Sequence, residues 1–169
     1  DDADIEHAVN AATFGSFMHQ GQICMSVERV IVHKDVAKDF IDKFVANTKK
    51  LKVGNPREMA NCIGPIINQK QLDKIRDQVD DAVAKGAKVL CGGKYKGLFY
   101  EPTVLTNITR DMKVMREETF GPIAPVITVG SVDEAVEIAN DSEYGLSAAI
   151  ITRNEERGLA IARRLHTGM

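Results

Sequence analysis

Residues 17–26 read Phe17-Met18-His19-Gln20-Gly21-Gln22-Ile23-Cys24-Met25-Ser26 and join two different secondary-structure patterns. Before them, residues 5–17 carry apolar side chains at helical spacing. After them, residues 27–32 are rich in β-branched side chains and predict a buried strand. Gly21 is placed to end the helix. A thiol on such a junction is exposed and held by backbone on both sides, so Cys24 suits a nucleophile better than a buried structural role.

The rest of the chain alternates the same two patterns. Asp2 or Asp4 is the expected N-cap of the first helix, and Asp35 that of the second. Residues 99–105 predict an extended segment that is an antiparallel or irregular insertion. Further helices are predicted at residues 35–51, 68–85, 132–140 and 155–165, and further strands at residues 87–90, 123–129 and 146–152.

This alternation predicts the fold class. Strands separated by long helices imply right-handed crossovers and a mostly parallel sheet. Strands this apolar fit a sheet with helices on both faces. We therefore predict an α/β fold.

Composition excludes several classes of function. The chain has 169 residues, 44% hydrophobic and 27% charged, which fits one globular domain with a core and argues against wholesale disorder. Its 22 basic and 24 acidic residues are interspersed, so no nucleic-acid partner is expected. The longest apolar stretch, residues 123–129, is too short to span a bilayer, and the acidic N-terminus does not resemble a signal peptide, so no membrane partner is expected.

The cysteines and histidines favour a thiol enzyme over a metal protein. Cys24, Cys62 and Cys91 are an odd number at wide spacing, which argues against a disulfide framework or a zinc site and for a reducing compartment. The four histidines are scattered, so no metal ligand is assigned. We expect a cytoplasmic protein.

A second stretch, Glu117-Glu118-Thr119-Phe120-Gly121-Pro122, carries a further candidate site. Glu118 and Phe120 are two residues apart and share a face if the segment is extended. A carboxylate beside an aromatic ring suits a sugar joined to a flat heterocycle. Taken alone, the stretch is more often a solvated acidic pair before a Gly-Pro turn, just as a lone cysteine is more often a small buried hydrophobe.

Together, and in this order, the two stretches resemble the aldehyde dehydrogenase family. The first matches as Phe17-x-x-x-Gly21-Gln22-x-Cys24, and the second as Glu117-Glu118-x-Phe120-Gly121-Pro122. The resemblance covers essentially the whole chain and implies the cysteine-bearing catalytic domain of that family.

The resemblance also implies a mechanism and a cofactor. In the family, a cysteine thiolate attacks an aldehyde to give a thiohemiacetal, hydride leaves to a nicotinamide, and water hydrolyses the resulting thioester. Cys24 is then the nucleophile, and its N–H is one oxyanion donor. Glu118 is expected to contact the nicotinamide ribose and Phe120 to pack near the nicotinamide of NAD or NADP.

Two family features are missing from residues 1–169. The chain has neither a Gly-x-Gly-x-x-Gly fingerprint nor the Glu-Leu-Gly-Gly segment that supplies the general base. We therefore expect a catalytic domain excised from a longer chain, without its cofactor-binding and oligomerisation segments, and inactive by itself. The parent enzyme is expected to be a homo-oligomer, a dimer or a tetramer.

Substrate and rival functions stay open at this point. Residues 21–29 look most like bacterial enzymes that act on aromatic aldehydes such as salicylaldehyde, benzaldehyde or vanillin. The alternatives are a CoA-acylating semialdehyde dehydrogenase, a thiol esterase and a non-catalytic structural relative. The presence of both Cys24 and Glu118 argues against the last.

Overall fold

The computed structural model describes residues 1–168. A four-stranded sheet in the order β1-β6-β5-β2 forms its centre, and β3 and β4 form a separate hairpin. Within the described residues, no helix has the length and apolar character needed to cross a membrane. The elements in chain order are α1 (Ile5–Phe17), the 3₁₀ helix η1 (Met18–Gly21), β1 (Val30–His33), α2 (Lys34–Thr48), α3 (Gln69–Ala84), β2 (Lys88–Cys91), β3 (Tyr95–Lys96), β4 (Phe99–Tyr100), β5 (Thr103–Thr106), α4 (Lys113–Arg116), β6 (Ile123–Val129), α5 (Val132–Asn140) and α6 (Glu155–Ala162).

The sheet is mostly parallel, as predicted. β1 and β5 both run parallel to β6, and only the edge strand β2 is antiparallel to its neighbour. The antiparallel pairing expected at residues 99–105 is confirmed, since β4 pairs with β3 and β5 pairs with β2. The second half is not an insertion, however, because β5 also pairs with β6 inside the sheet. Pro102, which has no N–H to donate, separates β5 from the short strand β4.

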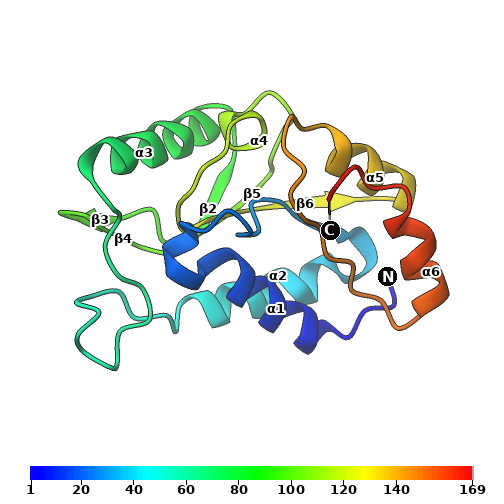
Figure 1. Cartoon of the computed structure of the whole chain (residues 1–169), viewed down its shortest axis with the longest axis horizontal. Coiled ribbons are helices and arrows are strands. Elements are labelled where there is room, and N and C mark those ends of the chain that lie inside the picture. Colours follow the sequence, from blue (N-terminus) through cyan, green and yellow to red (C-terminus); the bar gives the residue numbers. More distant parts are fainter. Residues whose placement is uncertain (169) are drawn as a thin grey trace.

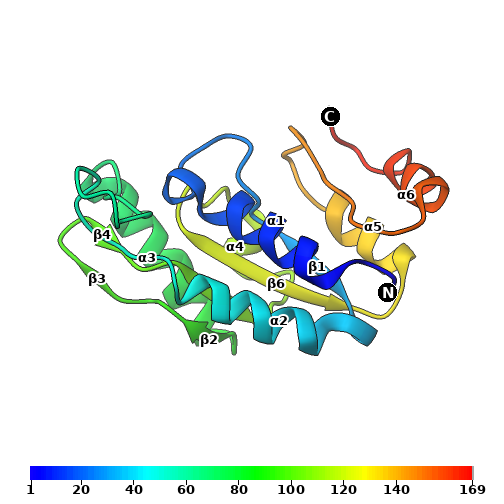
Figure 2. The same ribbon diagram turned by 90° about the horizontal axis from the view of Figure 1, so that it is seen from below.

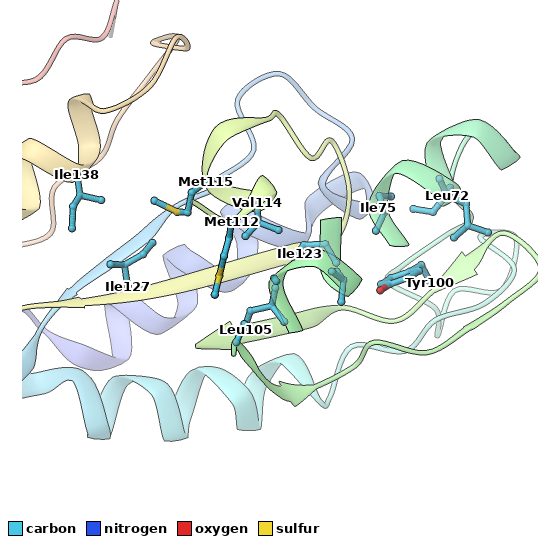
Figure 3. Close-up of a cluster of buried hydrophobic side chains, with 14 of the residues drawn as sticks. Leu72, Ile75, Tyr100, Leu105, Met112, Val114, Met115, Ile123, Ile127 and Ile138 are labelled. Atoms are coloured by element: carbon cyan, nitrogen blue, oxygen red, sulfur yellow. The ribbon is translucent and has the colours of Figure 1, made fainter. Parts of the chain in front are cut away.

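Helices cover both faces of the sheet (Figure 1), with α3 on one side and α1 and α2 on the other. Alternation along β6 divides its side chains between two cores. Ile123 and Ile127 belong to the same core cluster as Leu72 of α3 (Figure 3), whereas Ala124 and Val126 join the core under α1 and α2. Full burial of each large aliphatic side chain contributes roughly 1.5–3 kcal/mol, so both layers depend on this strand.

Helices α1 and α2 lie next to each other on their face of the sheet (Figure 2). The Phe17 and Phe44 rings stack between them with centroids 5.9 Å apart. Phe17 is the last residue of α1, so this contact anchors the helix end from which the cysteine stretch departs.

The observed helix starts correct one of the predicted caps. Asp4 caps α1, since its carboxylate accepts the His7 N–H at 3.0 Å. The second helix is capped by His33, whose ring nitrogen accepts from the Asp35 N–H, so Asp35 lies in the first turn and is not the cap.

Two predicted strands differ from the observed structure. The strand expected at residues 27–32 begins only at Val30, because the Val27 N–H bonds to the Gly15 carbonyl at 2.9 Å. The strand expected at residues 146–152 is absent from the described part of the chain. An extended segment becomes a strand only beside a ladder partner, and no described strand pairs with this one.

The last helix is joined to the N-terminus at one end of the molecule (Figures 1 and 2). Arg157 in α6 pairs with the Asp1 carboxylate at 2.6 Å, and the Thr152 hydroxyl donates to the Asp2 carboxylate at 2.7 Å. No residue of α6 is buried, so these polar contacts replace a core there.

Candidate active site

The cysteine stretch leaves α1 through a left-handed reversal. His19, Gln20 and Gly21 all have positive φ, at 50°, 59° and 66°. Left-handed backbone costs a non-glycine L-residue roughly 1–2 kcal/mol, so the surrounding contacts must hold this reversal in place. The chain then turns at residues 23–26, where the Ser26 N–H bonds to the Ile23 carbonyl at 2.9 Å.

Cys24 lies at the exposed tip of this turn. Its side chain is exposed, as predicted from the junction. Among residues 1–168 its backbone N–H donates to no other group, so it stays available to a ligand. Cys62 is also exposed, whereas Cys91 is half-buried and its pKa is raised, chiefly by burial. All three are free thiols.

Strand register brings the second stretch beside the first. β1 and β6 are parallel neighbours in which Val30 lies opposite Val126. Cys24 and Phe120 stand the same number of residues before these two partners. Their segments therefore enter the two parallel strands at the same end of the sheet. The fold therefore brings together two stretches that lie nearly a hundred residues apart in the sequence.

Two glycines let the segments meet at backbone distance. A Cβ on Gly21 would lie 2.1 Å from the Gly121 carbonyl oxygen, closer than any side chain tolerates. Gly121 in turn packs against Ile75, whose Cδ1 would lie 2.4 Å from a Cβ on that glycine. The Gly-Gln-x-Cys and Phe-Gly-Pro glycines therefore serve a contact between the two stretches.

Glu28 makes a second link between the segments. Its two carboxylate oxygens accept the N–H groups of Thr119 and Phe120 at 2.9 and 2.8 Å. Burial raises the pKa of the Glu28 carboxyl, and the Glu118 charge adds to this rise. The two amide hydrogen bonds and the Lys74 charge oppose it.

Helix α3 supports the same peptide from its other side. The Gln71 amide donates to the carbonyls of Thr119 and Phe120 at 2.7 and 3.0 Å. The buried Gln78 amide donates to the Glu118 carbonyl at 3.3 Å. Phe120 itself has a φ of 52°, so its ring direction depends on these contacts.

A cavity of about 300 Å³ opens between the two stretches and α3. Its lining combines a phenyl ring, an imidazole, an aliphatic side chain and three amide side chains: Phe120, His19, Ile67, Gln20, Gln22 and Gln71. Gln22 shapes its rim, because its side-chain oxygen accepts the Ile67 N–H at 2.9 Å.

Glu118 is partly exposed beside this cavity-forming segment. Its N–H donates to the Tyr144 hydroxyl at 3.4 Å. Within residues 1–168 its carboxylate accepts no hydrogen bond, so both oxygens are free for hydroxyl groups of a ligand. No group of three or more histidine, cysteine or acidic side chains in this part of the chain is arranged to hold a metal ion.

The structure thus brings the segments of the three predicted site residues together. Phe120 lines the cavity with residues of the cysteine stretch, whereas Cys24 and Glu118 lie outside its lining. Sequence reasoning assigned no role to Glu28. The sequence did contain a sign that Glu28 has a role, namely the charged pair Glu28-Arg29 inside an otherwise apolar strand pattern. Buried charges are rare unless they have partners.

Arg29 is the other member of that pair and is structural. Its guanidinium donates to the carbonyls of Met115, Ile138 and Asp141, at the ends of α4 and α5. Burial lowers the pKa of Arg29, and the Asp141 carboxylate opposes that shift.

Comparison with known proteins identifies a family and several relatives of this chain. The model of the Aldehyde dehydrogenase family matches residues 1–169. Benzaldehyde dehydrogenase [NAD(+)] of Pseudomonas putida is 46% identical over 168 residues, covering 99% of this chain and 34% of that protein. Salicylaldehyde dehydrogenase of Pseudomonas sp. (strain C18) is 47% identical over 169 residues, with 99% and 35% covered.

A solved structure shows the same fold. Succinate-semialdehyde dehydrogenase from Burkholderia pseudomallei superposes with a TM-score of 0.97 at 42% identity, covering 100% of this chain and 36% of that one. The chain therefore spans about a third of the length of the proteins it matches.

Proposed function

Because this chain belongs to the aldehyde dehydrogenase family, we propose that it is the cysteine-bearing catalytic domain of a longer enzyme. That enzyme oxidises an aldehyde to a carboxylic acid with NAD or NADP. One observation carries the proposal: an exposed Cys24 turn is locked beside the Phe120 segment by the Gly21–Gly121 contact and by Glu28.

Cys24 is the proposed nucleophile. Its thiolate sulfur bonds to the aldehyde carbon, the C=O electron pair moves onto oxygen, and a thiohemiacetal forms. The Cys24 N–H, which has no partner among residues 1–168, is a proposed donor to that oxyanion. Loss of hydride from the same carbon leaves a thioester on Cys24. Water then adds to its carbonyl, the C–S bond breaks, and the acid and the thiol are released.

Residues in and beside the cavity suit the nicotinamide and ribose of a dinucleotide. The Phe120 ring offers a flat apolar surface, and the unpaired Glu118 carboxylate suits ribose hydroxyls. NAD or NADP, when bound, supplies the hydride acceptor. Gln71 is less available than its place in the cavity suggests, because its amide nitrogen already donates to two backbone carbonyls.

An aromatic aldehyde is the proposed substrate. Relatives that share 46–47% of this chain's residues are named for benzaldehyde and salicylaldehyde. Near the thiol the chain exposes Met25 by 61%, and at the end of α1 it exposes Phe14 by 65% and Met18 by 43%. Exposed methionine and aromatic side chains of this kind suit a flat apolar ligand.

Replacing Cys24 tests the proposal. In the full-length enzyme, Cys24→Ala is expected to abolish NADH formation from benzaldehyde or salicylaldehyde, while Cys62→Ala, a matched exposed thiol, retains it. Mass spectrometry after brief aldehyde turnover should find an acyl group on Cys24. Turnover that survives in Cys24→Ala contradicts the mechanism.

Two further measurements separate the rival functions. Product analysis with and without CoA distinguishes hydrolysis of the thioester from CoA acylation, and we propose hydrolysis. Hydrolysis of an activated ester that persists in Cys24→Ser would exclude a Cys24 thiol esterase.

The isolated domain is proposed to be inactive, because the family's general-base segment is not among residues 1–169. Steady NADH formation by the 169-residue chain would contradict this. We also propose a homo-oligomeric parent enzyme, checked by its mass in solution. A cytoplasmic location is proposed on the three free thiols.

A further inference from the structure

The backbone of Thr119 and Phe120 is held entirely by two side chains from elsewhere in the fold. Both N–H groups donate to the Glu28 carboxylate, and both carbonyls accept from the Gln71 amide. Glu28 belongs to the segment that follows Cys24, whereas Gln71 belongs to α3. The two pairs of hydrogen bonds therefore reach the peptide from opposite sides.

Of these two pairs of hydrogen bonds, only the pair made by Glu28 connects the peptide to the segment that carries Cys24. It stands between the turn at residues 23–26 and the start of β1 at Val30. A shift of its carboxylate would move the Phe120 segment relative to the Cys24 turn. Gln71 cannot set that relation, because α3 lies on the other side of the peptide.

Stability alone does not explain a carboxylate at this position. Burial penalises the charged form, and Glu118 places a second negative charge nearby. Lys74 and Arg29 are the cations that interact with Glu28. A neutral side chain would avoid this cost, but a carboxylate alone offers two equivalent acceptors to two successive N–H groups.

We propose that Glu28 is a positioning residue that sets the Glu118–Phe120 segment against the Cys24 turn, so that the cofactor site and the nucleophile keep one relative geometry. The inference rests on the proposed function. It adds a residue that touches neither the cofactor nor the aldehyde and acts through the backbone of Thr119 and Phe120. The left-handed φ of Phe120, 52°, is the conformation that this clamp maintains.

The kinetic test uses Glu28→Gln in the full-length enzyme. Gln keeps the size but turns an NH₂ towards one of the two N–H donors, so one hydrogen bond to a charged group is lost. The KM for NAD is expected to rise by about 10-fold or more. The KM for benzaldehyde and the rate of Cys24 alkylation by iodoacetamide should stay within about two-fold, since the turn has its own hydrogen bond.

Asp81→Asn is the matched control. Asp81 also accepts a backbone N–H from another element, that of Lys113 at 2.8 Å, but its partners are Lys113 and Lys85 and it bonds to none of residues 117–121. It should lower stability without changing the KM for NAD. An unchanged KM for NAD in Glu28→Gln, or an equal rise in Asp81→Asn, overturns the proposal.

A second measurement needs neither cofactor nor turnover. Amide hydrogen exchange in the 169-residue chain should quicken at Thr119 and Phe120 by about 10-fold or more in Glu28→Gln, and stay unchanged at Val126 in β6. Unchanged exchange at Thr119 and Phe120 overturns the proposal by itself. Failure of the dehydrogenase assignment would instead show as turnover that survives Cys24→Ala, and would leave the exchange result intact.

Discussion

Gly21 is the residue at which the two halves of the site touch. It combines a φ of 66° with a neighbouring carbonyl oxygen at 2.1 Å from where its Cβ would lie. Either property excludes most side chains, and together they explain why a glycine stands two residues before the cysteine turn.

Gly21→Ala is expected to lower the free energy of unfolding by about 3 kcal/mol or more, because left-handed strain adds to a backbone clash. Gly97→Ala is the control, since Gly97 also has a positive φ, 56°, but nothing lies within 4 Å of its Cβ position. It should cost about 1 kcal/mol. Urea unfolding of both variants checks this, and equal losses would show that the Gly121 contact does not matter.

Glu28 also predicts how stability depends on pH. The pKa of Glu28 is raised above its ordinary 4.5, chiefly by burial, so the folded chain binds more protons than the unfolded chain between these two values. Its contribution is therefore complete below pH 4.5 and is lost as the pH rises through the folded-state pKa. Urea unfolding from pH 4.5 to 7 should show the wild type losing free energy of unfolding relative to Glu28→Gln. A wild type whose free energy of unfolding rises with pH relative to that of Glu28→Gln would contradict this.

Asp81 provides the opposite sign in the same titration. The Lys113 N–H, followed by the Lys85 ammonium, holds the pKa of Asp81 below its ordinary 3.8. Its contribution is present above pH 3.8 and disappears as the pH falls through the folded-state pKa. The wild type should therefore lose stability relative to Asp81→Asn only in acid.

At the scale of the element, α3 presents one continuous stripe to the Glu118–Phe120 segment. Gln71, Ile75 and Gln78 are spaced at i, i+4 and i+7, so they share one face of the helix. The two amides bond to the backbone of the segment, and Ile75 fills the space beside Gly121. Apolar residues at helical spacing place Ile75 on the inward face of α3, but no pattern in the sequence marks Gln78 as buried.

Ile75→Ala tests this stripe. Ile75 is fully buried, so its truncation should cost about 2–5 kcal/mol and leave a void against Gly121. Val83→Ala on the same helix should change stability by no more than about 0.5 kcal/mol, since Val83 is 47% exposed. Chemical denaturation measures both, and a loss below about 1 kcal/mol for Ile75→Ala would show that the helix face repacks.

At the scale of the whole molecule, two cores lie on the two faces of one sheet, and helix α6 belongs to neither core. α6 has no buried residue, and the Arg157–Asp1 and Thr152–Asp2 contacts tie its region to the N-terminus. An exposed ion pair such as Arg157–Asp1 contributes at most about 1 kcal/mol.

Native-state hydrogen exchange should therefore show α6 opening at a lower free energy than β6, whose residues lie in both cores. Asp2→Ala should quicken exchange in α6 further, because it removes the acceptor of the Thr152 hydroxyl. Coincident exchange free energies in α6 and β6 would indicate instead that the whole chain unfolds as one unit.

Local patterns in the sequence predicted much of this protein. Helical spacing and β-branched runs led to the α/β class, the helix at residues 132–140 and the strand at residues 123–129, and the two short stretches indicated the family. These features depend on neighbours along the chain, so they can be inferred without coordinates.

Only the tertiary structure decided how the two stretches meet. The parallel register of β1 and β6 places Cys24 and Phe120 at one sheet edge, and Glu28 turns from a strand residue into a clamp on two distant amides. The same long-range pairing decides that residues 146–152 remain unpaired. Register and ladder partners come from packing between segments far apart in sequence, and such contacts leave no periodic trace in the segments themselves.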